Sequence, residues 1–293
     1  SAAMSACGRA MRWQMALGLL REMPGHHVRP NDITYGAALS ACEKGHEWRW
    51  ALEILREARC EDLPPSLVNY NAAISACEKA EYWQHSLGLL GEMWCARVTP
   101  DVVTYSAAIS ACEKGSEWQR AMWLLSEMTS RAGLQPAVIA CSAAISACES
   151  GQQWRHALAL LGEMRRCALD PDVVTYNAAV RACERGLQWA AALVLLHELQ
   201  QCALRPTAVT YTAAVGTCEA RGLLGRARPL LARLETDILS DICGLGTAAR
   251  AAGGGRAGKA YLRQRCRGIS TRRCRTRLRQ PPSACLAGSA GFA

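Results

Sequence analysis

Residues 100–115 read PDVVTYSAAISACEKG, and residues 171–186 read PDVVTYNAAVRACERG. The two copies nearly match, but Ser106 in the first corresponds to Asn177 in the second. Similar segments, aligned on their TY and AC pairs, recur along most of the chain with a fixed period. Such a period is typical of a solenoid, in which each unit buries its apolar face only by stacking on its neighbours.

The alignment divides residues 1–242 into seven units. Every complete unit has 35 residues except one of 36, and the first unit is truncated at its start. The units are 1–31, 32–66, 67–101, 102–137, 138–172, 173–207 and 208–242. The last unit is degenerate, because Pro229 lies inside its expected second helix and Leu224 replaces a tryptophan. Since the chain opens inside a unit, we expect it to be a piece of a longer protein.

Each unit is predicted to form two helices. Tyr176, Ala179, Val180 and Cys183 follow the i, i+3, i+4, i+7 spacing of one helical face. A glycine turn then leads to a second helix, as in 153–164 (QWRHALALLGEM). The sequence therefore predicts an all-α chain, a right-handed α-solenoid of about seven helical hairpins.

The loop after each second helix ends at a proline, which suits the entry to the next helix. Asp101 and Asp172 follow two of these prolines and are well placed to cap the helix that comes next.

Sixteen cysteines would suggest disulfides, but seven of them recur once per unit. Such a residue is more typical of small apolar packing in a reducing compartment. The recurring cysteines are Cys7, Cys42, Cys77, Cys112, Cys148, Cys183 and Cys218. No CxxC pair occurs and no histidine stands at zinc spacing, so we predict no metal site and no cofactor.

The net charge of +9 is unevenly distributed. From Cys243 on there are eleven Lys and Arg and no Asp or Glu, so the 23 basic and 25 acidic residues before it give a net charge of −2. Segment 243–293 is low in complexity. Its composition leaves open whether it binds nucleic acid or an acidic surface, or is simply disordered. No apolar run approaches the ~20 residues of a membrane span.

The repeated pattern VVTYNAAISACEKG, followed by a tryptophan, an AL-x-LL-x-EM segment and a PD pair, resembles the pentatricopeptide repeat. This repeat is an RNA-binding relative of the tetratricopeptide repeat, whose period of about 34 residues and Trp-Leu-Gly signature do not fit. The resemblance covers residues 1–242. One departure is a constant tryptophan at the start of the second helix, which we interpret as packing between hairpins. These residues are Trp13, Trp48, Trp83, Trp118, Trp154 and Trp189.

In this family one unit reads one RNA base. The resemblance implies that the fifth and the last residue of a unit, here called its reading pair, contact the base. The fifth residues are Ser1, Gly36, Asn71, Ser106, Ser142, Asn177 and Thr212. The last residues are Asn31, Ser66, Asp101, Ala137, Asp172, Thr207 and Ile242. The alternative is that a small polar residue in a first turn tolerates exchange, and that the final Asp is only a helix cap.

The resemblance also implies which base four of the pairs prefer. These are Asn71/Asp101 for uracil, Ser142/Asp172 for guanine, Ser1/Asn31 for adenine and, weakly, Asn177/Thr207 for a pyrimidine. Three pairs depart from the recognised combinations and stay unread: Gly36/Ser66, Ser106/Ala137 and Thr212/Ile242. From its 5′ end, the implied RNA register is A-n-U-n-G-Y-n.

Two further rows of residues are candidates for RNA contact. The second residue of each unit is β-branched, and by resemblance it clamps the base, although helix packing would explain it equally well. These residues are Ile33, Val68, Val103, Ile139, Val174 and Val209. A cation near the end of the first helix is a candidate phosphate contact, or a solvated helix end that favours the helix dipole. These residues are Arg9, Lys44, Lys79, Lys114 and Arg185.

The sequence carries no sign of catalysis. The H-x-E and C-x-x-C motifs of a deaminase are absent, as is a phosphate-binding loop. We expect a non-catalytic, monomeric, sequence-preferring binder of single-stranded RNA that acts in RNA processing, stabilisation or translation, with protein partners possible. By resemblance alone its place is a mitochondrion or plastid. The alternatives are a protein-binding scaffold without RNA specificity, or a degenerate member of a large set.

Overall fold

The computed structural model describes residues 2–61, 63–202, 204–223, 225, 229, 230 and 233. These residues form thirteen α-helices and one short 3₁₀ helix, and no strand occurs among them. The helices alternate along the chain between a first and a second helix of each unit. The prediction of an all-α solenoid is confirmed, whereas the tail 243–293 lies outside the described residues.

The first helices carry odd numbers and the second helices even numbers. The odd helices are α1 (Ala2–Arg9), α3 (Asp32–Lys44), α5 (Leu67–Lys79), α7 (Val102–Lys114), α9 (Val138–Ser150), α11 (Val173–Arg185) and α13 (Ala208–Ala220). The even helices are α2 (Trp13–Glu22), α4 (Trp48–Cys60), α6 (Trp83–Cys95), α8 (Trp118–Ser130), α10 (Trp154–Arg166) and α12 (Trp189–Gln201). The 3₁₀ helix η1 (Pro24–His26) follows α2.

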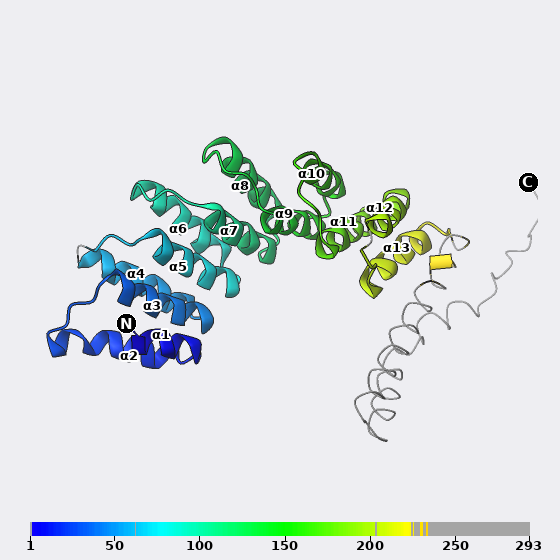
Figure 1. Ribbon diagram of the computed structural model, residues 1–293. Coiled ribbons are helices and arrows are strands. Elements are labelled where there is room, and N and C mark those ends of the chain that lie inside the picture. The colour runs from blue at the N-terminus through cyan, green and yellow to red at the C-terminus, as the bar shows by residue number, and fades with distance from the viewer. Residues whose placement is uncertain are drawn as a thin grey trace, which may run out of the picture. The chain divides into compact units, whose positions relative to one another are not determined.

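The odd helices form a continuous layer. Each odd helix packs against the next odd helix, and also against the even helices that come before and after it in the chain. Figure 1 shows the even helices α6, α8, α10 and α12 along one side of the stack. The odd helices α5, α7, α9, α11 and α13 lie along the other side. The first turns of neighbouring odd helices therefore lie side by side.

Small residues line the contacts between odd helices. Ala108, Ala111 and Cys112 of α7 are fully buried, and the corresponding Ala and Cys positions of α3, α5, α9 and α11 are buried in the same way. Burial raises the pKa of the Cys112 thiol to about 11. These thiols are therefore unreactive packing groups, as the sequence predicted.

The last residue of the preceding unit caps the N-termini of α3, α7, α11 and α13, whereas the Ser66 side chain does not cap α5. Asp101 accepts a hydrogen bond from the Thr104 backbone N–H at 2.8 Å, and Asp172 does the same for Thr175 at 2.8 Å. The predicted caps are thus confirmed. Ala137 has no side-chain acceptor, so α9 begins without such a cap.

The tryptophan that opens an even helix packs on the turn of the next unit. A Cβ atom on Gly45 would lie 2.5 Å from Cδ1 of Trp13. The glycines at the equivalent turns, Gly115, Gly151 and Gly186, face tryptophans still more closely. This confirms the interpretation of the tryptophans as packing between hairpins.

These turn glycines are required for space and not for backbone conformation. Gly115 has a φ of −77°, which any residue adopts, whereas the left-handed residue of the turn is the next one, Ser116, at +58°. Unit 67–101 has Ala80 at this turn, and there Trp48 stacks on Tyr82, with ring centroids 4.3 Å apart.

Gly115→Ala is therefore expected to lower the free energy of unfolding by about 1–3 kcal/mol, because the added methyl group must displace Trp83. The matched control is Gly88→Ala in α6, where no atom lies within 4 Å of an added Cβ. That variant should gain ~0.5–1 kcal/mol from helix propensity. Urea unfolding followed by circular dichroism measures both, and equal effects of the two substitutions would contradict the packing argument.

Candidate nucleic-acid interface

A row of large apolar side chains is exposed along the first turns of the odd helices. The six β-branched residues at the second position of the units are between 47% and 69% exposed. They run from Ile33 in α3 to Val209 in α13. Because they do not pack inside the protein, helix packing does not explain them, and an exposed apolar row of this kind is typical of a contact surface.

The reading pair of unit 67–101 is brought together across two neighbouring helices. Asn71 lies in the second turn of α5, and Asp101 caps α7. The Asn71 Nδ2 donates to Asp101 Oδ1 at 3.2 Å, and the Thr104 hydroxyl donates to Asn71 Oδ1 at 2.5 Å. The two polar side chains thus form one site next to the exposed Val68 and Val103.

The carboxylate of Asp101 is held in its charged form. Burial alone would raise its pKa, but hydrogen bonds from the Thr104 amide and hydroxyl, from Asn71 and from the Val103 amide together lower the pKa below its usual value. At neutral pH Asp101 therefore acts only as a hydrogen-bond acceptor.

Two other reading pairs are joined by hydrogen bonds, one directly and one through a threonine. The Asn177 Nδ2 donates to Thr207 Oγ1 at 3.2 Å, and Thr210 donates its hydroxyl proton to Asn177 Oδ1. The link between Ser142 and Asp172 is indirect. The Ser142 hydroxyl lies 2.5 Å from the Thr175 hydroxyl, which donates to Asp172 Oδ1 at 2.7 Å.

Two further pairs, both within the described residues, are not joined. The Ser106 hydroxyl donates to the Val102 carbonyl of its own helix at 2.7 Å, and Ala137 offers it no partner. A Cβ atom on Gly36 would lie 3.0 Å from Oδ1 of the buried Asn69, so that amide closes the space a reading side chain would need. These positions match two of the pairs left unread from the sequence.

For two reading pairs the structure describes only one of the two residues. Asn31 caps α3 and is exposed, while its partner Ser1 lies outside the described residues. Thr212 turns its hydroxyl to the Ala208 carbonyl at 2.6 Å, and its partner Ile242 also lies outside the described residues.

Sequence reasoning missed the third residue of each unit. Thr104, Thr175 and Thr210 are fully buried, and each hydroxyl contacts the reading pair of the preceding unit. Their recurrence in the TY pair was visible in the sequence. Only the structure shows that they belong to the site of the neighbouring unit.

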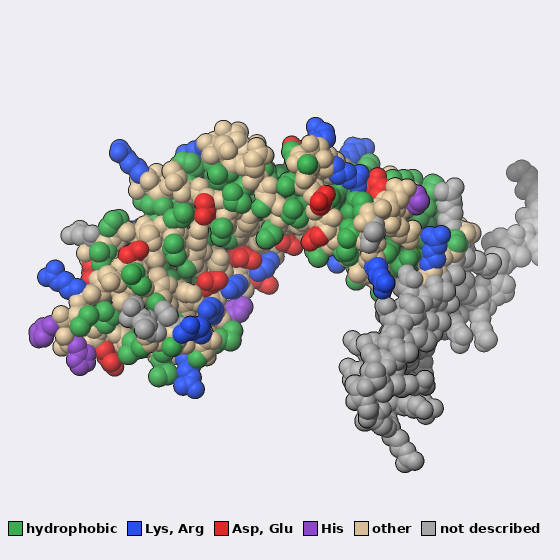
Figure 2. All heavy atoms as spheres, viewed as in Figure 1, with side chains coloured by type: hydrophobic (Ala, Val, Ile, Leu, Met, Phe, Trp, Pro, Cys, Tyr) green, Lys and Arg blue, Asp and Glu red, His purple; other side chains and the backbone are tan. Residues whose placement is uncertain are grey.

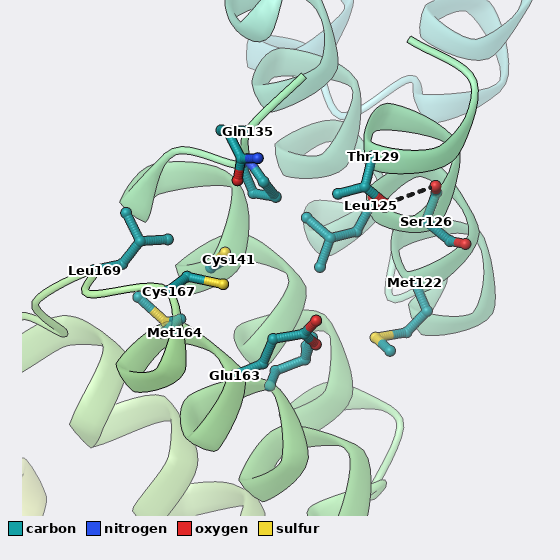
Figure 3. A pocket seen from close by; sticks show the side chains of 12 residues that line it. Met122, Leu125, Ser126, Thr129, Gln135, Cys141, Glu163, Met164, Cys167 and Leu169 are labelled. Atoms are coloured by element: carbon teal, nitrogen blue, oxygen red, sulfur yellow. Dashed lines mark hydrogen bonds between the residues drawn. The ribbon is translucent and has the colours of Figure 1, made fainter. Parts of the chain in front are cut away.

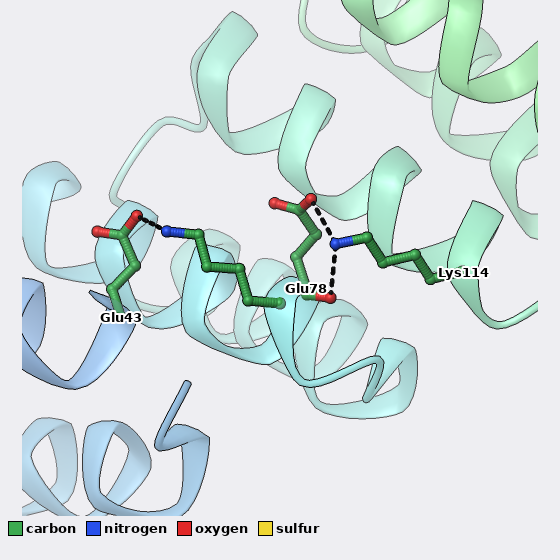
Figure 4. A network of polar contacts seen from close by, with 4 residues as sticks. Glu43, Glu78 and Lys114 are labelled. Carbon is green, nitrogen blue, oxygen red and sulfur yellow. Dashed lines mark hydrogen bonds and ion pairs between the residues drawn. The ribbon is translucent and has the colours of Figure 1, made fainter. Parts of the chain in front are cut away.

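The candidate phosphate contacts take part in ion pairs between units. Lys79 pairs with Glu43 at 2.8 Å and Lys114 with Glu78 at 3.1 Å, as Figure 4 shows. Arg185 lies 3.5 Å from Glu149. Each of these cations thus meets a glutamate of the preceding unit. On the face shown in Figure 2, basic and acidic side chains are correspondingly interspersed.

The pattern is not complete along the chain. Gly8 stands where the other units have the glutamate, and no ion pair of Lys44 is found within the described ranges. Ser150 and Ala220 also break the row of cations, and Ser150 replaces the cation that would face Glu113. Burial is the main cause that raises the pKa of Glu113, and the neighbouring Glu78 and Glu149 add to it.

A pocket of about 400 Å³ lies away from these residues, among α8, α9 and α10 (Figure 3). Cys141 and Cys167 line it together with apolar side chains such as Leu160. Cys141 occupies the fourth position of its unit, where the complete units on either side have the buried Tyr105 and Tyr176. The pocket thus lies beside a position that holds a buried tyrosine in the neighbouring units.

Two further searches of the described residues gave negative results. No group of three or more His, Cys, Asp or Glu side chains there is placed to hold a metal ion. No helix in the described ranges combines the length and the apolar character needed to cross a bilayer.

Glu113→Gln is expected to raise the free energy of unfolding at pH 7. A carboxyl whose folded-state pKa lies above the unfolded value binds its proton more tightly when folded, so the wild type loses stability as pH rises through that interval. Glutamine has no such loss, and the gain should vanish below pH 4.5, the ordinary pKa of this group. Urea midpoints across pH 4–8 measure it.

The control is Glu78→Gln, the same substitution one unit earlier. Because Glu78 has its lysine partner, that variant should lose up to about 1 kcal/mol at pH 7. A gain for Glu113→Gln that persists at pH 4 would contradict the role assigned to charge burial.

Comparison with known families identifies the repeat. The pentatricopeptide repeat domain matches residues 18–80, 53–115 and 123–185, and the PPR repeat matches residues 1–28 and 103–131. A comparison with curated protein sequences found no match.

Several solved structures share the fold. The pentatricopeptide repeat protein PPR10 from maize has a TM-score of 0.59 and 22% identity over 80% of this chain and 33% of that one. PPR10 in complex with an 18-nt psaJ RNA element gives 0.56 and 26%, over 80% and 32%. The PPR domain of Arabidopsis thaliana protein-only RNase P 1, in complex with tRNA, gives 0.55 and 16%, over 62% and 95%.

The chain spans about a third of the length of the PPR10 protein it matches. Its repeats match the family over more than half of its own length, and the helices follow the same units. The chain belongs to the pentatricopeptide repeat family.

Proposed function

We propose that this chain binds single-stranded RNA across the first turns of its odd helices, reading about one base with each joined reading pair. The contact between Asn71 and Asp101 carries the proposal. These residues are 30 positions apart in sequence, yet their side chains are hydrogen-bonded to each other. The Asn71 amide both donates, to Asp101, and accepts, from Thr104. Base edges are recognised by such groups.

The surroundings of this site fit an unpaired base. Val68 and Val103 are exposed although they are large and apolar, so they offer contact area to the flat faces of a base. The residues of the reading pair differ from unit to unit, while most positions around them in the odd helix change little. Such a layout suits a partner whose backbone repeats and whose bases differ.

The relatives support the same class of ligand. PPR10 has been crystallised with an 18-nt RNA element, and the repeat domain of protein-only RNase P 1 with tRNA. The present chain matches the repeat part of the family, and we propose that it acts as a monomeric, non-catalytic RNA binder in a mitochondrion or plastid. Its role there would be RNA processing, stabilisation or translation.

Phosphate contacts would come from the row of cations near the ends of the odd helices. Placement outweighs the net charge of −2 over residues 1–242, because a local row of cations sets the field that RNA meets. Five full phosphate contacts would give a log–log salt slope near −3.5, at ~0.7 per contact on a single strand. The glutamates paired with Lys79, Lys114 and Arg185 reduce its magnitude.

Asn71→Ser is expected to shift the preferred third nucleotide of the A-n-U-n-G-Y-n register from U to G. The substitution places serine beside Asp101 and Thr104, which reproduces the arrangement of Ser142 with Asp172 and Thr175. The change in discrimination should be about 1–3 kcal/mol, the range of one good base contact. Fluorescence anisotropy of the full chain with RNAs that differ only at this nucleotide measures it.

The fifth nucleotide serves as the internal control, because Ser142 is unchanged and its preference for G should persist. The basic segment 243–293 contributes equally to all these RNAs and cancels in their affinity ratios. Equal affinity of the wild type for all bases at both nucleotides would reject base reading. Weak binding that does not depend on salt would favour a protein-binding scaffold instead.

The cation row is tested by Lys44→Gln, which should reduce the magnitude of the salt slope by about 0.7. The comparison variant Lys114→Gln should reduce it less, because Glu78 already neutralises Lys114 at 3.1 Å. Titrations at four salt concentrations give both slopes. Identical slopes for both variants and the wild type would show that the row does not contact phosphates.

A further inference from the structure

Two serines at the same position of neighbouring units behave differently. Ser106 and Ser142 are both fifth residues, and both are half-buried in the second turn of an odd helix. The Ser106 hydroxyl donates to its own helix, at the Val102 carbonyl. The Ser142 hydroxyl instead meets Thr175 of the following unit at 2.5 Å.

The difference follows from the third residue of the next unit. Behind Ser106 this position is Ala140, which has no hydroxyl, whereas behind Ser142 it is Thr175. Thr175 is fully buried, so it cannot touch an RNA base itself. Its hydroxyl donates to Asp172 Oδ1 at 2.7 Å.

The carboxylate of Asp172 fixes the direction of the hydrogen bonds that link Ser142, Thr175 and Asp172. An ionised carboxylate accepts only, so the single proton of the Thr175 hydroxyl goes to Asp172. The Thr175 oxygen is then free only to accept, and the Ser142 hydroxyl must donate its proton to it. Ser142 consequently presents lone pairs, and no proton, to whatever lies in front of it.

We propose that Thr175 is a positioning residue for base specificity, which makes Ser142 and Asp172 a pair of neighbouring acceptors and so selects guanine. This inference rests on the proposed function. Guanine presents two neighbouring N–H donor groups, N1–H and the N2 amino group, on its Watson–Crick edge. Adenine presents one donor, its N6 amino group, beside one acceptor, N1. A pair of acceptors on the protein offers no donor to adenine N1, so that atom would stay without a hydrogen bond.

The test is Thr175→Val in the full chain, with RNAs of the form A-n-U-n-G-Y-n whose fifth nucleotide is G or A. Valine keeps the shape and removes the hydroxyl, so Ser142 should turn its hydroxyl to the Val138 carbonyl of its own helix, as Ser106 does with Val102, and away from the base. The ratio of affinities for G over A should fall roughly fivefold, the scale of one hydrogen bond. Most of the change should come from weaker binding of the G-containing RNA, which loses an acceptor.

Two variants separate this effect from a loss of stability. Thr175→Ser restores the hydroxyl and should restore the ratio. Thr217→Val in α13 removes another buried hydroxyl, one that donates to the Ala214 carbonyl of its own helix at 2.7 Å, and should leave the ratio unchanged. A purely structural role for Thr175 would weaken G and A binding equally.

The same inference can be tested by adding the missing groups to the site of Ser106. Ala137→Asp alone supplies the carboxylate next to Ser106, and Ala137→Asp with Ala140→Thr completes the arrangement. Only the double variant should prefer G at the fourth nucleotide, again by roughly fivefold over the single one. Equal preferences in the single and double variants would overturn the inference.

The two proposals fail in different ways. A wild-type chain with no base preference at the fifth nucleotide would reject base reading, and this inference with it. A wild-type preference for G that Thr175→Val leaves unchanged would reject only the role of Thr175.

Discussion

The close approach of neighbouring odd helices is the constraint on which the other features of this protein depend. Alanine and cysteine occupy the contacting faces and are fully buried there. Their short side chains let the first turns of two helices come near enough for Asn71 to reach Asp101. The contact of each tryptophan with the turn of the next unit and the ion pairs of the lysines also connect neighbouring units. A larger residue in the alanine layer would therefore separate several contacts at once.

Much of the architecture followed from the sequence because it depends on local patterns. The period, the two helices of each unit and the Asp101 and Asp172 caps needed only spacing and residue type. Partners across units were harder to predict. Glu43 and Lys44 are neighbours in the chain, yet Glu43 pairs with Lys79, 36 residues away. The sequence showed a glycine at most turns, but only the structure shows that these glycines make room for tryptophan while a residue such as Ser116 adopts the left-handed conformation.

Several side-chain contacts that other units have are missing at unit 138–172. Cys141 lines a pocket at the position that Tyr105 and Tyr176 occupy in the neighbouring units, and Ser150 cannot pair with Glu113. The helix α9 also begins without a side-chain cap. In a linear array each interface contributes its own share of stability. These departures therefore weaken one junction rather than the whole protein, and they leave the Ser142 site on its far side intact.

The third-position threonine has a consequence for how such repeats can be exchanged. Thr175 belongs by sequence to one unit and by contact to the proposed base-reading site of the unit before it. A segment cut from Val138 to Asp172 and moved to another array would carry Ser142 and Asp172 but leave Thr175 behind. The portable module is therefore offset from the repeat itself, and it ends after the first turn of the following helix. Recombination at the helix boundary would preserve the fold and alter what the neighbouring module recognises.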